Sequence, residues 1–172
     1  AARSASGFSS WRNEFRITAL AAGISESTFD TAFRNVRYNP NTKETAENQA
    51  EFVRPIWKYL DTAVSAARIS TGRAKARSMQ GLLRSLEGKY RVDGEVLLAI
   101  WGMETNFGSF RGNTYTLEAL ANAVYSGRRR AFAESELIAA LEILSRGNVP
   151  PSRMLGSGSG AMGHTQFMPT TY

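Results

Sequence analysis

The stretch Ala99-Ile100-Trp101-Gly102-Met103-Glu104-Thr105-Asn106-Phe107-Gly108 places a single carboxylate at the end of an otherwise apolar segment. Large apolar residues precede Glu104 at helical spacing, so the glutamate shares one helix face with Leu97, Ile100 and Trp101. Asp93 is a good N-cap and Gly108 a good C-terminal stop, which predicts a helix with Glu104 in its last turn.

The position of Glu104 at the end of an apolar helix affects whether its carboxyl group keeps a proton. Apolar surroundings and the negative end of the helix dipole both disfavour a charged carboxylate. A carboxyl that keeps its proton near neutral pH can act as a general acid, so we predict that Glu104 is the catalytic residue. In the structural alternative, the glutamate reaches past the helix end to solvent or to an arginine.

The composition narrows the possible functions. The 172 residues are 42% hydrophobic and 21% charged, which is typical of a soluble globular protein. No apolar run approaches the roughly 18 residues that a membrane span needs, so we expect no transmembrane segment. The chain has no cysteine and one histidine, His164, which argues against disulfides, thiolate catalysis and a histidine-rich metal site. We therefore expect no metal and no cofactor.

The net charge of +6 suggests a polyanionic partner, such as nucleic acid, an anionic membrane or an acidic cell-wall polymer. One group of basic residues (Arg68, Arg73, Lys75, Arg77 and Arg84) follows a helical region and is typical of a solvated helix face. The run Arg128-Arg129-Arg130 lies between two amphipathic segments, where three adjacent cations need anionic partners or water.

Helical periodicity continues along most of the chain, with no alternation long enough to predict a strand and no internal repeat. The first predicted helix begins at Ser9 or Ser10 and carries Trp11, Phe15 and Ala22 on one face. Later stripes are Leu117, Leu120, Ala121 and Val124, and then Leu137, Leu141 and Leu144. One helix from Pro55 to about Ser70 is predicted to bury Trp57, Leu60, Val64 and Ala67. The glutamates of the later segments are predicted to be exposed: Glu118, Glu134, Glu136 and Glu142.

Residues 155–169 break this pattern. The segment opens like a glycine-serine linker but continues with Met162, Gln166, Phe167 and Met168. Such a mixture favours a loop whose backbone passes close to a ligand while a few side chains hold it. The final residues, 169–172, read as an interrupted helix start, so we expect the fold to be truncated at the C-terminal end.

Two motifs together carry a family resemblance. Residues 103–108 (Met-Glu-Thr-Asn-Phe-Gly), followed by residues 160–169 (Gly-Ala-Met-Gly-His-Thr-Gln-Phe-Met-Pro), resemble the soluble-type lytic murein transglycosylase B family, glycoside hydrolase group 103. The resemblance spans most of residues 8–172. It implies a mainly α, lysozyme-like helical fold in which residues 1–172 form the N-terminal and central part of a catalytic domain. We expect a helical lobe at 1–70 and a catalytic core at 71–172 that contains Glu104 and the 156–169 loop.

The resemblance also assigns roles to single residues. Glu104 matches the catalytic acid, and Ser157 matches a loop serine that contacts that carboxylate. The other matches are expected to bind the saccharide: Gln166 and Phe167 along the cleft, Met162 at its floor, Arg128 and Arg129 nearby, and the upstream aromatic Tyr59. Each has a structural alternative, as a linker serine, a core side chain or a solvated charge. Family members continue into a further helical portion, in some with a calcium loop, and neither is present here.

The implied activity is that of a lytic transglycosylase. It cleaves the β-1,4 bond between N-acetylmuramic acid and N-acetylglucosamine and leaves 1,6-anhydromuramoyl products, with one carboxyl group and no cofactor. Two alternatives stay open: a lysozyme-type hydrolase, which transfers the sugar to water, and a non-catalytic fragment that binds peptidoglycan. A nucleic-acid partner ranks low because no recognition motif accompanies the basic charge.

The family also implies a location and partners. We expect the periplasm of a Gram-negative bacterium, with any signal or lipid anchor outside these residues. The expected partner is the peptidoglycan glycan strand. A cleft that lacks one wall is expected to leave apolar surface that the missing C-terminal portion or self-association covers.

Overall fold

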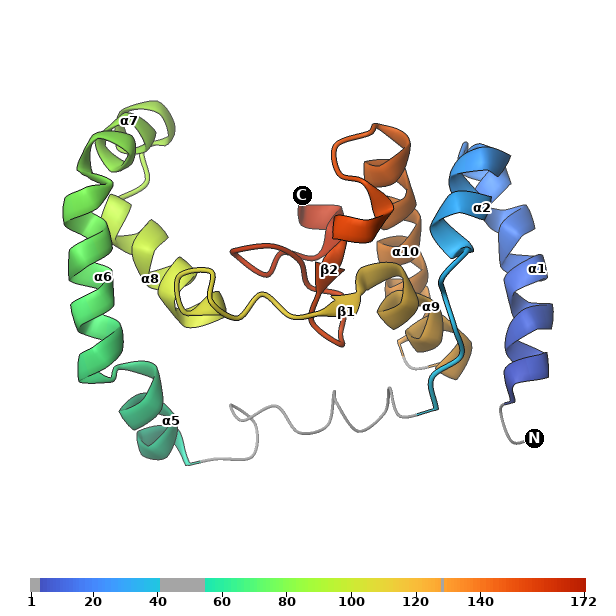
Figure 1. Cartoon of the computed structure of the whole chain (residues 1–172), viewed down its shortest axis with the longest axis horizontal. Helices are drawn as coiled ribbons and strands as arrows, with labels where there is room; N and C mark the ends of the chain where they lie inside the picture. The colour runs from blue at the N-terminus through green and yellow to red at the C-terminus, as the bar shows by residue number, and fades with distance from the viewer. Residues whose placement is uncertain (1–3, 41–54, 128) are drawn as a thin grey trace. The chain divides into compact units, whose positions relative to one another are not determined.

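The computed structural model describes residues 4–40, 55–127 and 129–172, and helices dominate it (Figure 1). The described residues form two compact units. The first contains 4–40, 112–163 and 167–172, and the second contains 55–111 with 164–166. The boundary that the sequence suggests near residue 70 falls within α6 (Ala66–Ser78), inside the second unit.

The core of the first unit lies where α2 (Glu26–Phe33), α9 (Thr116–Ser126) and α10 (Arg130–Ser145) meet. The predicted apolar stripes of α9 and α10 are buried, including Leu117, Leu120, Val124, Leu137 and Leu141. The α1 helix (Ala5–Ala21) packs on α2. It begins earlier than the sequence suggests, because the Ser4 side chain caps it by accepting a hydrogen bond from the Gly7 N–H.

Aromatic rings join α1 to α2. Trp11 stacks on Phe15 with ring centroids 5.4 Å apart, and Phe29 stacks on Phe33 at 4.2 Å. The prediction that Trp11 and Phe15 are buried is confirmed, whereas Ala22 is exposed because α1 ends one residue before it.

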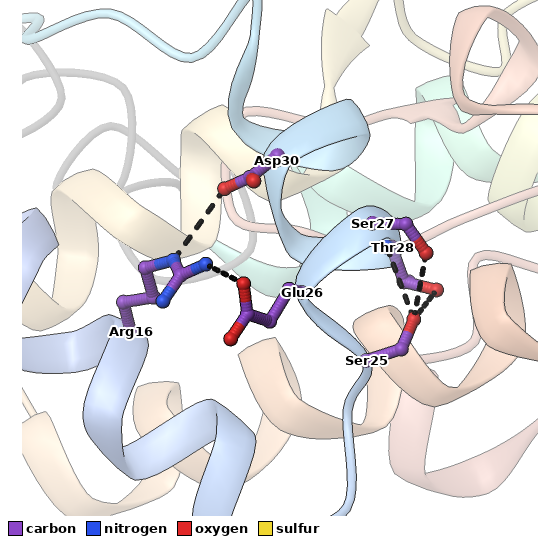
Figure 2. Close-up of polar contacts among 6 residues, drawn as sticks. All are labelled: Arg16, Ser25, Glu26, Ser27, Thr28 and Asp30. Atoms are coloured by element: carbon purple, nitrogen blue, oxygen red, sulfur yellow. Dashed lines mark hydrogen bonds and ion pairs between the residues drawn. The ribbon is translucent and has the colours of Figure 1, made fainter.

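Polar side chains join α1 to the start of α2 (Figure 2). Ser25 caps α2 by accepting a hydrogen bond from the Thr28 N–H at 3.2 Å. Arg16 on α1 donates to the carboxylates of Glu26 at 2.9 Å and Asp30 at 3.5 Å, both on α2. One guanidinium thus bridges two positions four residues apart, which favours one angle between the helices.

A two-stranded antiparallel sheet leads into the glycine-rich segment. Strand β1 (Thr114–Tyr115) pairs with β2 (Leu155–Gly156), with Thr114 opposite Gly156. A β-carbon at Gly112 would collide with the Gly156 carbonyl, so the close approach of these backbones requires glycine there. The sheet fixes where the loop after Gly156 begins.

The second unit contains α5 (Ile56–Ala63), α6, α7 (Gln80–Tyr90) and α8 (Gly94–Thr105), with α8 packed against α6 and α7. The prediction of one buried helix over 55–70 is wrong. The backbone leaves the helical conformation at Val64, and Ser65 caps a new helix. Trp57, Leu60 and Val64 are 64%, 48% and 59% exposed, and Ala67 is also exposed, because the described residues place no element over that stripe.

Glu136 also departs from the expected pattern. The sequence places it on an exposed face, but it is 1% exposed, whereas Glu118, Glu134 and Glu142 are half-buried. Thr170, at the start of η2 (Pro169–Thr171), supplies two hydrogen-bond donors to the Glu136 carboxylate and so permits its burial.

The expectation of a mainly helical fold is confirmed. Within the described residues, two strands of two residues each interrupt the helices. Among the described helices, none combines the length and the hydropathy required to cross a bilayer.

Candidate functional site

The predicted helix around Glu104 is present as α8. Asp93 caps it by accepting a hydrogen bond from the Glu95 N–H at 2.8 Å. It ends at Thr105, and Asn106 follows in the left-handed conformation with φ 48°. Phe107 and Gly108 also have positive φ values, of 57° and 87°. The chain therefore turns sharply two residues after Glu104, which lies in the last turn of the helix as predicted.

The surroundings of Glu104 differ from the sequence-based expectation. Its side chain is exposed, so the apolar environment inferred from its helix face is absent. The burial of the apolar residues that precede Glu104 explains why its side chain is exposed. Leu97 is half-buried and Ile100 is exposed, so the stripe follows the edge of the packed face of α8.

Thr105 fixes the turn that follows Glu104. Its side chain is 1% exposed, and its hydroxyl donates to the backbone carbonyl of His164 at 2.7 Å. The same oxygen accepts a hydrogen bond from the Gly108 N–H at 3.0 Å. One hydroxyl therefore ties residues 164–166 to the end of α8 and closes the turn, which restricts where the Glu104 backbone can move.

The ring of Phe107 supports this end of α8 from another side. A β-carbon on Gly102 would lie 2.7 Å from the Phe107 ring, and one on Gly72 of α6 would lie 3.2 Å from it. Trp101 meets the same ring edge-to-face at a centroid distance of 5.6 Å. The two glycines therefore provide the space in which Phe107 packs.

Residues 164–166 make further contacts within the second unit. The Trp101 indole donates to His164 Nδ1 at 2.9 Å, and Gln166 Nε2 donates to the Arg111 carbonyl at 3.1 Å. Gln166 itself has φ 50°. The structure thus brings the predicted site residue Gln166 to the segment that follows Glu104.

In the first unit, Ser157 begins a tight turn. Its amide donates to the Ala161 carbonyl at 2.9 Å, and its hydroxyl accepts from the Ala161 N–H at 3.1 Å. The Ser157 and Ser159 hydroxyls are 2.9 Å apart. Gly156 and Gly160 are buried in this turn. The linker alternative for the glycine-serine segment is therefore excluded, since hydrogen bonds and burial order it.

Met162 and Phe167 lie opposite each other on the two arms of the next turn. The Met162 amide donates to the Phe167 carbonyl at 2.8 Å, and the Phe167 amide donates back at 3.1 Å. Met162 is half-buried against the core, whereas Phe167 is 46% exposed. The core alternative for Phe167 is wrong, and its ring is available to a ligand.

The remaining predicted binding residues lie elsewhere. Arg129 precedes α10 with φ 43°, and its guanidinium lies 4.2 Å from the centre of the Phe132 ring. Tyr59 is half-buried on α5 in the second unit. Arg128 lies outside the described residues.

Two further observations concern ligands. Within the described residues, no three histidine, cysteine or acidic side chains lie close enough together to hold a metal ion. A hollow of about 860 Å³ lies between α10 and η2, with Arg130, Ile138 and Tyr172 among its lining residues. None of the predicted site residues lines it.

Sequence reasoning missed Thr105 and His164 as site residues. Thr105 is adjacent to Glu104 and three residues before Gly108, which is the spacing of a side chain that closes a turn. No local sequence pattern singled out His164, because its contacts are with Trp101 and Arg111, which are 63 and 53 residues away in the chain.

Residues 7–172 match the transglycosylase SLT domain family. A segment of 84 residues is 38% identical to membrane-bound lytic murein transglycosylase B of Escherichia coli, covering 48% of this chain and 23% of that protein.

Solved structures agree in fold. The similar SltB3 of Pseudomonas aeruginosa, in complex with NAG-NAM-pentapeptide, has 47% identity and a TM-score of 0.90 over 95% of this chain and 44% of its own. SltB1 of the same organism has 28% identity and a TM-score of 0.81, covering 95% and 55%. The chain spans about half the length of these relatives. The lysozyme-like fold expected from the sequence is confirmed, and the chain belongs to the transglycosylase SLT domain family.

Proposed function

We propose that this chain is the part of a lytic murein transglycosylase that carries the catalytic acid, Glu104. The observation that carries the proposal is the family match over residues 7–172, within which Glu104 lies in the last turn of α8. SltB3, which is similar over 95% of this chain, has been solved with NAG-NAM-pentapeptide and with NAG-anhNAM-pentapeptide. These two ligands differ by the anhydro group that a lytic transglycosylase forms.

A single carboxyl group is sufficient for this reaction. The Glu104 carboxyl gives its proton to the glycosidic oxygen, and the bond from C1 of N-acetylmuramic acid to that oxygen breaks. The acetamido group of the same sugar stabilises the positive charge at C1. The Glu104 carboxylate then accepts the proton of the C6 hydroxyl as that oxygen bonds to C1. The products are a 1,6-anhydromuramoyl end and a free N-acetylglucosamine hydroxyl, and Glu104 regains its proton.

The exposure of Glu104 is compatible with this chemistry only when the bound strand covers it. A carboxyl in water is mostly ionised near neutral pH, and removal of water by the sugar favours the protonated form. The ordered turn after Glu104 supports the proposal, because it restricts the backbone next to the carboxyl group. We therefore assign the low-dielectric environment to the complex with the glycan.

We assign the binding of the saccharide to the residues that the family resemblance singles out. Phe167 offers an exposed ring on which a sugar face can pack, and Met162 supports the turn that presents it. Gln166 and Ser157 provide polar groups, although Gln166 also donates to the Arg111 carbonyl and Ser157 also bonds within its own turn. Arg128, Arg129 and Tyr59 keep their proposed roles near the strand.

A Gram-negative periplasm is the location that fits this substrate. The similar E. coli protein is described as membrane-bound, and the net charge of +6 suits an anionic wall polymer. The proposed partner is the peptidoglycan strand, and the proposed chemistry uses no cofactor.

Digestion of purified sacculi tests the function, with the products analysed by mass spectrometry. Anhydromuropeptides, each one water lighter than the corresponding reducing-end product, support the transglycosylase. Reducing ends instead indicate a lysozyme-type hydrolase, and binding without release indicates a non-catalytic fragment. Glu104→Gln keeps the side-chain shape and removes the transferable proton, so it should abolish release while the variant still binds sacculi. Glu95→Gln, at the opposite end of α8, is the matched control and should retain activity.

A further inference from the structure

The imidazole of His164 lies between two groups that can only donate hydrogen bonds. On one side, Trp101 Nε1 is 2.9 Å from His164 Nδ1. On the other side, Arg111 Nη1 is 3.4 Å from His164 Nε2. All three residues belong to the second unit.

This arrangement determines the tautomer of His164. An indole N–H has no acceptor capacity, so Nδ1 must be the acceptor and carry no proton. A neutral imidazole then carries its proton on Nε2, the atom that faces Arg111. The guanidinium also only donates, so the contact between Nε2 and Nη1 joins two donors and is not a hydrogen bond.

Two donors at this separation can share one oxygen acceptor. Both side chains are exposed, and among the described residues no acidic side chain forms an ion pair with Arg111. A carboxylate suits the pair best. Its two oxygens can accept from the planar guanidinium, and one of them can also accept from the imidazole N–H. We propose that Arg111 and His164 form a binding site for a carboxylate.

The surroundings add positive charge and place this site beside the candidate catalytic helix. Lys75 lies 5.3 Å from the centre of the Trp101 ring. Trp101 is one helical turn before Glu104 on α8, so the residue that orients His164 shares a helix face with the acid. The Arg111 backbone is in turn held by the side chain of Gln166.

The identity of the carboxylate rests on the proposed function. A peptide attached to muramic acid ends in a carboxylate, whereas the N-acetylated sugars themselves are neutral. We assign the site to this peptide carboxylate, so the enzyme would prefer glycan strands that bear peptides over bare strands. A small free anion is the other source of the same chemistry, and the binding experiment below separates the two.

The tautomer can be tested without any ligand. His164 is the only histidine in the chain, so a long-range ¹H–¹⁵N NMR spectrum contains a single imidazole. At about pH 8, where an ordinary imidazole is neutral, we expect a protonated Nε2 and an unprotonated Nδ1. A protonated Nδ1 would overturn the proposal, because Arg111 could then donate to Nε2 and satisfy it.

Binding is measured in the Glu104→Gln background by calorimetry, so that turnover cannot consume the ligand. The probes are a disaccharide-peptide with a free terminal carboxylate, the same compound with that carboxylate amidated, and sodium acetate. We expect the free carboxylate to bind about tenfold more tightly than the amide, and Arg111→Gln to remove this difference. Arg84→Gln, an exposed arginine on α7, is the charge-matched control and should preserve it.

Trp101→Phe tests whether the tautomer of His164 controls binding. It removes the indole donor, which frees His164 to adopt the other tautomer and accept from Arg111. The preference for the free carboxylate should fall although Trp101 contacts His164 and is not one of the two residues assigned to bind the carboxylate. Equal binding of the free and amidated peptides would overturn the proposal, and acetate binding as tightly as the peptide would overturn its assignment to a peptide. Should Glu104→Gln retain activity, the proposed function fails while this binding comparison still stands.

Discussion

Glu136 on α10 accepts two hydrogen bonds from Thr170, one from the backbone N–H at 2.9 Å and one from the hydroxyl at 2.6 Å. The carboxylate is 1% exposed. This pair attaches the last described turn of the chain to the core of the first unit. It also orders the backbone that follows Phe167 and Met168, so a buried acid outside the candidate site helps to place one of its loops.

Removing this pair should destabilise the first unit. In Glu136→Gln, the Thr170 N–H keeps only a neutral amide oxygen as its acceptor, and the Thr170 hydroxyl must rotate to accept from the NH₂ group, so both charge-assisted hydrogen bonds are lost. We expect the free energy of unfolding to fall by about 1–3 kcal/mol in urea titrations. The control is Glu134→Gln on the same helix, whose carboxylate forms only a 3.9 Å ion pair with Arg130 and whose loss should cost less than about 0.5 kcal/mol. Equal effects of the two variants would contradict a special role for Glu136.

Thr105 should affect both stability and activity. Thr105→Val keeps the shape but removes the hydroxyl that bonds His164 and Gly108, so about 1–3 kcal/mol of stability should be lost. Because the turn after Glu104 loosens, the rate of anhydromuropeptide release should fall more than saccharide binding does. Thr105→Ser restores the hydroxyl and should recover most of the rate. A Ser variant as slow as the Val variant would show that the methyl group matters instead.

Gly102 and Gly88 are a matched pair of helix glycines. Gly102→Ala places a β-carbon 2.7 Å from the Phe107 ring, so the ring must move and we expect a loss of about 1–3 kcal/mol. A β-carbon at Gly88 on α7 meets nothing within 4 Å, and Gly88→Ala should stabilise the helix by about 0.5–1 kcal/mol. Thermal unfolding of both variants measures the difference. Opposite signs are expected because packing opposes helix propensity only at Gly102.

We expect the folded protein to lose stability in alkali because of Tyr115. Its hydroxyl donates to the Ala32 carbonyl at 2.9 Å, and burial raises the pKa of Tyr115 to about 12. The raised pKa means that the fold favours the neutral phenol. This contribution, up to about 2 kcal/mol, is therefore present below the unfolded value of about pH 10 and lost as pH rises toward 12. Urea titrations across this range should show a smaller loss for Tyr115→Phe than for the wild type.

We expect the protein to self-associate through the exposed apolar side chains of α5. Trp57 and Leu60 are 64% and 48% exposed on a short helix. Contiguous apolar surface of this kind favours contact with a second molecule. Sedimentation velocity should show association that depends on concentration and weakens in Trp57→Ser and Leu60→Ser, with unfolding free energies changed by less than about 0.5 kcal/mol. A monomer at all concentrations would mean that another partner or segment covers this face.

Local patterns in the sequence were enough to predict much of the helical framework. The stripes of α9 and α10, the cap at Asp93 and the position of Glu104 in the last turn depend on neighbours within one or two turns, and these predictions were confirmed. The break at Val64 was missed because the periodicity continues across it, although the backbone does not. The exposure of Glu104 was missed for a related reason, since spacing identifies a helix face but not which element covers it.

The sequence by itself therefore determined the helical class, the family resemblance and the residue that carries the candidate chemistry. Each of these depends on residues that are close together in the sequence. They form the helical periodicity, the capping side chains and the two motifs at 103–108 and 160–169. Only the tertiary structure decided that Glu136 is buried against Thr170 and that His164 lies between Trp101 and Arg111. These relationships join residues 34 to 63 positions apart. Burial and hydrogen-bond direction at such distances depend on how the helices pack, which no local pattern encodes.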